Sequence, residues 1–349
     1  MSQTLNQRTK RYHWMDALRG LAVFFVIFAH GIVTIDAKFE GLWPFLQFLG
    51  DSFKPFRMPI LMLLSGLLVV GSIAKGGKRY FTGKAHHILY PYIVWTVVMF
   101  ALSIAREILL GKESWDFFDT LLLNPAAHLW FIYNIMVYYA IAFLTVRYRP
   151  WLGIAFALVF YAITLLFTEN YLLQRLGFYC VFFMTGALAG AQLPKAVAFL
   201  EQVNKWVATA LFIAGYAYCA FYIEESKELE QFGIGFMIAF FAIIPGFSKL
   251  MMAVSKTRIS PALEWVGRDS LPIYVLHFPL MYALPVLLSR VYHGDPNLLF
   301  FVYIVSILAV CMLVAYLARK TLFFSLFFNS KGWSKVFNRR KTKTSEAMS

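Results

Sequence analysis

Long apolar runs repeat along nearly the whole 349-residue chain and constrain its fold more than any other feature. A run of about 17 to 25 apolar residues has the length of a helix that crosses a bilayer. Only a helix satisfies its own backbone hydrogen bonds in lipid, so each run is expected to be helical. Ten such runs occur, at residues 17–35, 55–73, 88–110, 128–146, 151–168, 173–193, 206–223, 232–252, 270–289 and 298–318. The sequence therefore predicts an all-α polytopic membrane protein with about ten transmembrane helices.

The composition agrees with a location in a membrane. Hydrophobic residues make up 60% of the chain and charged residues 14%, with a mean hydropathy of +0.65, which is too apolar for an ordinary soluble domain. The net charge is +14, but the basic residues lie between apolar runs rather than on one face, so nucleic acid is not an expected partner. Cys180, Cys219 and Cys311 lie inside apolar runs without paired or metal-ligand spacing and are expected to be packing residues.

The loops between the runs predict the orientation, because Lys and Arg collect on the cytoplasmic side of a membrane. An orientation with the N-terminus inside makes most of the 32 Lys and Arg residues cytoplasmic, including those of KGGKRYFTGK at 75–84. It leaves the acidic stretches at 112–119 and 224–230 outside. Both termini are therefore predicted to be cytoplasmic.

The chain contains no internal repeat and no linker long enough to separate two domains. We expect a cytoplasmic N-terminal segment at residues 1–14 and one membrane domain at 15–320. The basic and polar residues 321–349 are expected to form a cytoplasmic tail that contacts anionic lipid.

The first apolar run, DALRGLAVFFVIFAH, carries three ionisable residues. Arg19 and His30 are eleven residues apart, which places them on the same helix face within about 20° and roughly 16 Å apart along the axis. Asp16 precedes Arg19 by three residues, a spacing at which a carboxylate can hold a guanidinium. For Arg19, extension to the lipid headgroups competes with function. For His30, deep in the hydrocarbon, function is favoured over simple helix packing.

A second group of residues follows in FKPFRMPILMLLSG at 53–66. Pro55 and Pro59 suit the opening turn of a helix, so Arg57 and the positive end of the helix dipole would face the outer leaflet. This arrangement predicts a site for an anionic group or a developing oxyanion, with interfacial anchoring as the competing interpretation of Arg57.

Small residues indicate close helix contacts at two further places. Ser65 and Gly66 lie deeper in the second run, and GALAG occupies residues 186–190. Small side chains let the backbones of membrane helices approach one another.

These motifs resemble the acyltransferase 3 family of bacterial membrane O-acyltransferases. The first-helix signature is an arginine, ten residues and a histidine, and PFRMPILMLLSG at 55–66, HLWFIYNIMVYY at 128–139 and GRDSLPIYVLHFPL at 267–280 follow in order. The resemblance extends from about residue 13 to 320. The FRMP and HLWF motifs are similar to those of single-domain glucan-succinylating and polysaccharide-acetylating members. It implies an enzyme of the bacterial inner membrane that moves an acetyl or succinyl group from cytoplasmic acyl-CoA to a hydroxyl of an envelope or periplasmic carbohydrate.

The resemblance also implies roles for residues of the first two runs. His30 would act either as general base on the acceptor hydroxyl or as a nucleophile through an acyl-imidazole, and both routes stay open. Arg19, held by Asp16, would be its partner along the first helix. Arg57 would stabilise charge or bind an acidic acceptor.

Five further residues are candidates for substrate binding. Lys84 and His87 occupy the place where many relatives carry R-x-x-R, and would bind the anionic donor. Ser65, Trp130 and His277 are the candidates elsewhere, although hydrogen bonding across the bundle is an equally good interpretation of His277. The motif LWFIYNI lacks the glutamate that follows the tryptophan in O-antigen acetylases, which leaves the acceptor open. Acyl-CoA would be a substrate, so no tightly bound cofactor is expected, and the histidines lack the partners of a metal site.

Two further histidines stand near predicted helix ends. His128 stands at the predicted outer start of its run, where an interfacial role is favoured. His86, Lys78 and Arg79 are expected at the cytoplasmic mouth, where basic groups would hold the anionic nucleotide of the donor.

Other classes of protein also place charged residues inside a membrane. A transporter or flippase of a polysaccharide or lipid-linked sugar is the main alternative, but the two halves of the chain contain no repeated pair of interrupted helices. A transporter would also work without acyl-CoA. A membrane scaffold or sensor would have no use for the spacing of Arg19 and His30.

Overall fold

A computed structural model describes residues 12–39, 41–111, 116–122, 124–223 and 232–330 of the chain. These residues form helices joined by short connections, and no strand occurs among them. The elements are α1 (His13–Phe39), α2 (Pro44–Ser52), α3 (Lys54–Leu67), α4 (Val69–Ile73), α5 (Gly77–Lys84), the π-helix η1 (Ala85–Leu89), α6 (Tyr90–Leu110), α7 (Phe117–Leu122), the 3₁₀ helix η2 (Ala127–Leu129), α8 (Trp130–Thr145), α9 (Pro150–Phe167), α10 (Tyr171–Ala191), α11 (Leu193–Gln202), α12 (Lys205–Ile223), α13 (Ile234–Val254), α14 (Ser260–Arg268), α15 (Ser270–Val291), α16 (Pro296–Lys320) and α17 (Leu322–Ser325).

The predicted fold class is confirmed. Within the described residues, 8 helical segments are long and apolar enough to cross a membrane. They are His13–Phe39, Pro44–Ile73, Gly77–Leu109, Phe117–Thr145, Pro150–Phe167, Tyr171–Ala191, Ile234–Val254 and Pro296–Lys320. The two remaining predicted runs lie on the shorter apolar helix of α12 and on α15. The total of ten spans and the orientation of the termini stay predictions, and residues 1–11 and 331–349 of the predicted terminal segments lie outside the described residues.

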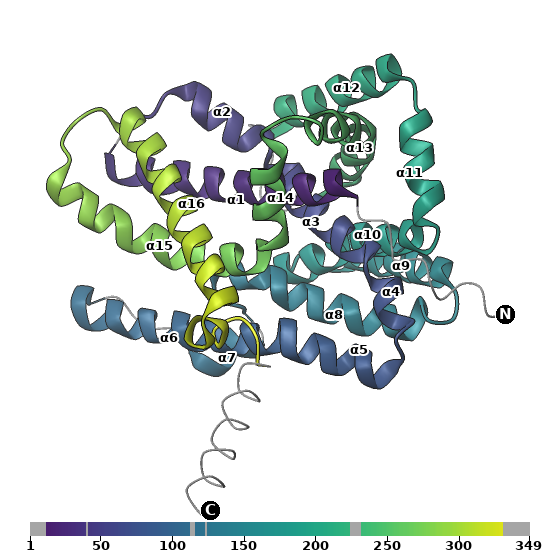
Figure 1. The fold of residues 1–349 in the computed structure, drawn as a ribbon, viewed down its shortest axis with the longest axis horizontal. Helices are drawn as coiled ribbons and strands as arrows, with labels where there is room; N and C mark the ends of the chain where they lie inside the picture. Colours follow the sequence, from purple (N-terminus) through teal and green to yellow (C-terminus); the bar gives the residue numbers. More distant parts are fainter. Residues whose placement is uncertain (1–11, 40, 112–115, 123, 224–231, 331–349) are drawn as a thin grey trace, which may run out of the picture.

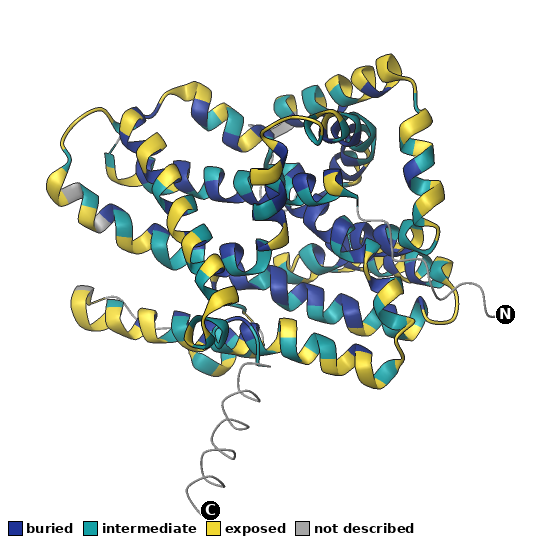
Figure 2. Cartoon of the chain, in the orientation of Figure 1, coloured by how far each residue is buried: buried dark blue, intermediate teal, exposed yellow. Residues whose placement is uncertain are grey.

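Helix α1 is the centre of the bundle. It packs against α14, α3, α15, α13, α16 and α2, and Figure 1 shows it near the middle of the molecule with α14 crossing it. Its buried residues recur from Trp14 to Ile35, whereas outer helices such as α6, α11 and α12 are largely exposed (Figure 2). The ionisable residues of the first run are therefore carried by the helix with the most helical neighbours.

Glycines let two helix pairs approach backbone to backbone. A methyl group on Gly20 of α1 would overlap the carbonyl oxygen of Leu263 in α14, and one on Gly267 would overlap the carbonyl oxygen of Asp16. Such close crossings are how helices pack where lipid supplies no hydrophobic driving force between them. This crossing fixes α14 against the start of α1.

The second close crossing joins α3 to α10. A methyl group on Gly66 would overlap the carbonyl oxygen of Phe183, and one on Gly186 would overlap that of Leu63. The close contacts expected at Gly66 and in GALAG are thereby confirmed, whereas the Ser65 hydroxyl donates to the carbonyl oxygen of Leu61 within α3. The crossing places the first turns of α3 and α10, which carry Arg57 and Arg175, on the same side of the bundle.

The start of α3 differs in part from the sequence prediction. Pro55 lies in the first turn, as expected, because its missing N–H needs no partner there. Pro59 lies inside the helix instead. Its place is tolerated because the N–H that proline lacks would have bonded to the carbonyl of Pro55, a single hydrogen bond near the helix start.

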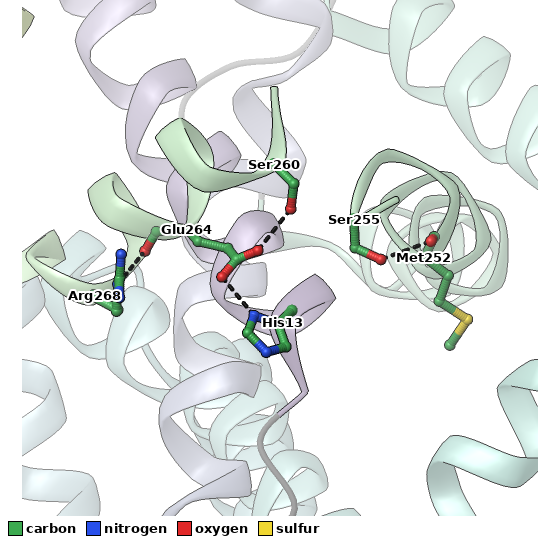
Figure 3. A network of polar contacts seen from close by, with 6 residues as sticks. All are labelled: His13, Met252, Ser255, Ser260, Glu264 and Arg268. Atoms are coloured by element: carbon green, nitrogen blue, oxygen red, sulfur yellow. Dashed lines mark hydrogen bonds and ion pairs between the residues drawn. The ribbon is translucent and has the colours of Figure 1, made fainter. Parts of the chain in front are cut away.

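A polar cluster ties the start of α1 to α14 (Figure 3). His13 Nδ1 lies 2.7 Å from Glu264 Oε2, and the Ser260 hydroxyl donates to Glu264 Oε1 over 2.7 Å. Arg268 Nε donates to the carbonyl oxygen of Glu264. Burial acts to raise the pKa of Glu264, but the hydrogen bonds from His13 and Ser260 and the nearby positive charge outweigh it and leave the pKa below its ordinary value.

The glycine crossing predicts a position-specific effect of one methyl group. Gly186→Ala forces the α3 and α10 backbones apart and is expected to destabilise the protein by at least about 2 kcal/mol, as overpacking does elsewhere. Gly71→Ala is the matched control, since a methyl group on Gly71 has no atom within 4 Å. Thermal unfolding of the two purified variants in the same detergent measures the difference. Equal melting temperatures would contradict the close crossing.

The Glu264 cluster predicts a stability that depends on pH. A lowered carboxyl pKa means that the folded protein binds this proton less readily than the unfolded chain. The stabilisation is therefore present above the ordinary carboxyl pKa of 4.5 and is lost as the pH falls through the folded value. Wild type is expected to melt above Glu264→Gln at pH 7, and the gap is expected to close as the pH falls below about 4.5. Glu201→Gln, at an exposed position, should show no such gap.

Candidate active site

One cavity surrounds His30 and is named here the His30 cavity. It has a volume of ≈ 170 Å³. The starts of α3, α8 and α10 supply much of its wall, because these three helices begin on the same side of the bundle. Its lining residues are Val26, His30, Lys54, Pro55, Arg57, Met58, Trp130, Tyr171, Arg175, Phe178, Tyr179, Phe232, Phe236 and Tyr274.

The second cavity, named the Arg19 cavity, has a volume of ≈ 160 Å³. It lies against the first half of α1. The end of α3, the start of α15 and the middle of α8 form much of its wall. Its lining residues are Arg19, Val23, Leu61, Ser65, Leu68, Ile88, Phe131, Ile135, Tyr139, Ser270, Leu271 and Tyr274.

The two cavities follow one face of α1 and meet at Tyr274. Arg19 lines one and His30 the other, while Tyr274 lines both. Helix α3 repeats this order in the opposite direction, with Arg57 in the His30 cavity and Ser65 in the Arg19 cavity. Arg19 and His30 therefore face two separate spaces that share a single aromatic wall.

A cluster of histidine rings lies behind His30. The ring centroids of His30 and His277 are 5.7 Å apart, and those of His277 and His128 are 5.5 Å apart. His277 is fully buried, its Nδ1 contacts the carbonyl oxygen of Tyr274, and its Nε2 has no hydrogen-bond partner among the described residues. Across the described chain, no group of three or more His, Cys, Asp or Glu side chains could hold a metal ion.

His128 is buried, contrary to the interfacial role that the sequence suggested. Only 2% of the residue is exposed, and its Nε2 lies 3.1 Å from the carbonyl oxygen of Val275. The ring also stacks on Phe278 with centroids 4.6 Å apart. Because α15 covers the start of α8, a position near a helix end is enclosed here rather than interfacial.

Stacked planar groups form one wall of the His30 cavity. The rings of Trp130 and Tyr179 stack with centroids 5.3 Å apart. The Arg175 guanidinium lies over the Trp130 ring, 4.4 Å from its centroid, and 5.2 Å from the ring of Tyr171. Arginine stacked on an aromatic face keeps its planar set of N–H donors in a fixed orientation.

The Arg19 cavity carries charge at its wall and just behind it. The Arg19 guanidinium donates to the carbonyl oxygen of Leu64 over 3.3 Å. Asp16, one turn earlier on α1, interacts electrostatically with Arg19. The Lys84 ammonium lies 3.5 Å from the ring centroid of Tyr139, which is itself a lining residue.

Comparison with known proteins identifies the family of this chain. The family model described as an acyltransferase domain, Acyl_transf_3, matches residues 12–316, nearly the whole chain. The chain belongs to the acyltransferase 3 family. This acyltransferase is therefore a membrane protein built on several apolar helices, as its sequence indicated. No curated protein and no solved structure matches the chain.

The structure brings together some of the predicted site residues of this acyltransferase and not others. His30, Arg57 and Trp130 share the first cavity, and Arg19 and Ser65 share the second. The remaining four line neither cavity: Asp16 supports Arg19, Lys84 covers Tyr139, His277 packs behind His30, and His87 is exposed on η1. The roles of all nine residues stay predictions.

Sequence reasoning missed polar residues that line the cavities of this acyltransferase, among them Arg175 and three tyrosines. Arg175, Tyr179 and Tyr274 belong to the His30 cavity, and Tyr139 to the Arg19 cavity. Arg175 carried a usable signal, because it is an ionisable residue inside the apolar run 173–193. The tyrosines carried no such signal, because aromatic residues are common throughout the chain.

If the two cavities open to opposite sides of the membrane, cysteines introduced into them should be labelled from opposite sides. Met58 and Ser65 lie on the same helix, roughly 10 Å apart along its axis, but line different cavities. A small membrane-impermeant thiol reagent should label Ser65→Cys from one side of oriented vesicles and Met58→Cys from the other.

The unsubstituted protein is the control for this labelling. Its cysteines, Cys180, Cys219 and Cys311, are buried and unpaired, as the sequence indicated, so the background should be low. Labelling of both variants from the same side would show that the cavities do not open to opposite faces.

Proposed function

We propose that this acyltransferase moves an acetyl or succinyl group from cytoplasmic acyl-CoA to a hydroxyl of an envelope or periplasmic carbohydrate, in a bacterial inner membrane. One observation carries the proposal: Arg19 and His30 stand on one face of α1 in two cavities that meet at Tyr274. A donor and an acceptor that cannot cross the bilayer need two such openings with the reacting group between them.

The donor side of the proposal uses the Arg19 cavity. The nucleotide of acyl-CoA is anionic and stays in water, where the exposed Lys78 and Arg79 on α5 offer positive charge. Lys84, at the end of the same helix, lies closer to the cavity, over Tyr139. The pantetheine arm would enter beside Arg19 and bring its thioester past Tyr274 to His30.

The acceptor side uses the His30 cavity. The acceptor hydroxyl gives its proton to the His30 imidazole while its oxygen attacks the thioester carbon. Arg57, which lines the same cavity and interacts electrostatically with His30, stabilises the oxyanion that forms. The carbon–sulfur bond then breaks, the proton passes to the CoA thiolate, and the acyl group stays on the acceptor oxygen.

A second route through the same residue uses His30 as the nucleophile. The imidazole nitrogen then takes the acyl group and releases CoA before the acceptor hydroxyl attacks. Incubation with labelled acyl-CoA and no acceptor separates the routes, because only the second route leaves label on His30.

The proposal predicts that transfer depends on His30. Purified protein in proteoliposomes, given labelled acetyl-CoA or succinyl-CoA and envelope carbohydrate, should label the carbohydrate. His30→Ala should lower this rate by about 10² to 10⁴-fold, the range that general acid–base catalysis supplies. His293→Ala is the matched control, because His293 is an exposed histidine outside both cavities.

Two results would contradict the proposal. Equal rates for His30→Ala and wild type would remove His30 from the chemistry. Absence of acyl transfer with any donor, together with carbohydrate movement across the vesicle without acyl-CoA, would identify a transporter instead.

A further inference from the structure

We infer that the His30 cavity takes a ligand that carries an anionic group, a carboxylate or a phosphate, and that Arg175 binds that group beside Arg57. The inference rests on the proposed function for the identity of the reaction, and it adds the chemical class of the substrate. Two sources of the charge are compatible with the cavity: an acidic substituent of the acceptor, or the free carboxylate of a dicarboxylic acyl group.

The lining of the His30 cavity is positively charged. Lys54, Arg57 and Arg175 all line it, and no Asp or Glu is among its described lining residues. Neither arginine forms an ion pair within the described chain. Asp51 interacts electrostatically with Arg57 but is exposed and does not line the cavity. Positive groups inside a membrane domain are costly without a counter-charge, and an anionic ligand supplies one.

Arg175 has the geometry of a ligand-binding arginine. Its guanidinium is stacked on Trp130, 4.4 Å from the ring centroid, and Trp130 is itself stacked on Tyr179. Its Nε is buried and has no hydrogen-bond partner among the described residues. A guanidinium held flat with an unused donor is suited to bind carboxylate or phosphate through two parallel hydrogen bonds.

The place of the two arginines connects the anionic group to the reaction. Arg57 acts electrostatically on His30, and Arg175 lines the same cavity of ≈ 170 Å³. The bound charge would therefore lie within the same small space as the group that reacts.

The test compares ratios of rates, which do not depend on the amount of folded protein. Purified wild type, Arg175→Gln and Arg175→Lys in proteoliposomes are each given acetyl-CoA or succinyl-CoA, with a neutral glucan or the same glucan bearing phosphate groups. Arg149→Gln is the control, because Arg149 is exposed at the start of α9 and lines neither cavity.

Two outcomes support the inference and name the source of the charge. If the acyl group carries it, Arg175→Gln should lower kcat/KM for succinyl-CoA by about tenfold or more relative to acetyl-CoA, as loss of a charged hydrogen bond does. If the acceptor carries it, the same loss should occur with both donors on the phosphate-bearing glucan and not on the neutral one. Arg175→Lys should recover part of the loss, because it keeps the charge but not the planar donors.

A binding measurement keeps this inference separate from the proposed function. Met58→Cys places a thiol in the His30 cavity, and succinate or inorganic phosphate should slow its reaction with a small neutral thiol reagent. Glucose at the same concentration should not slow it, and Arg175→Gln should abolish the protection.

The outcomes of the two measurements are distinguishable. Protection without any acyl transfer would overturn the proposed function and support the anion site. Unchanged ratios in Arg175→Gln together with an absence of protection would overturn the anion site while leaving acyl transfer in place.

Discussion

Direct backbone contact at glycines is the constraint on which the site depends. Gly20 and Gly267 hold α14 against α1, and Gly66 and Gly186 hold α10 against α3. In lipid, such crossings replace the hydrophobic driving force that joins helices in water. The α3–α10 crossing brings Arg57 and Arg175 to one cavity, and α1 supplies His30 to the same space.

Much of the helical architecture could be predicted from the sequence, because the length and polarity of each span are local properties of the chain. The apolar runs fall on helices, and the spacing of Arg19 and His30 placed both residues on one face of α1. Pro55 marked the start of α3 for an equally local reason, the missing N–H. Pro59 differs because its missing N–H costs a single hydrogen bond near the helix start, so it can lie beyond the first turn.

The arrangement of helices around each other could not be predicted in this way. His128 was expected near an interface because its run begins there, but α15 covers it and adds a carbonyl partner. His277 packs behind His30 through a contact between helices 247 residues apart in sequence, which no local pattern encodes. Arg175 could have been predicted by the rule applied to His30, that an ionisable residue inside an apolar run indicates a functional site. Tyr179 and Tyr274 could be assigned to the site only once the cavities were known.

Tyr274 gives the two cavities a shared boundary, and its hydroxyl donates to the carbonyl oxygen of His128. A molecule that displaced this ring from one side would change the volume available on the other, and the occupancies of the two cavities would then be linked. The linkage would be reciprocal. If ligands in the two cavities favoured the same position of the ring, each would increase the affinity of the protein for the other. Any such coupling would pass through one side chain and would need no movement of the helices.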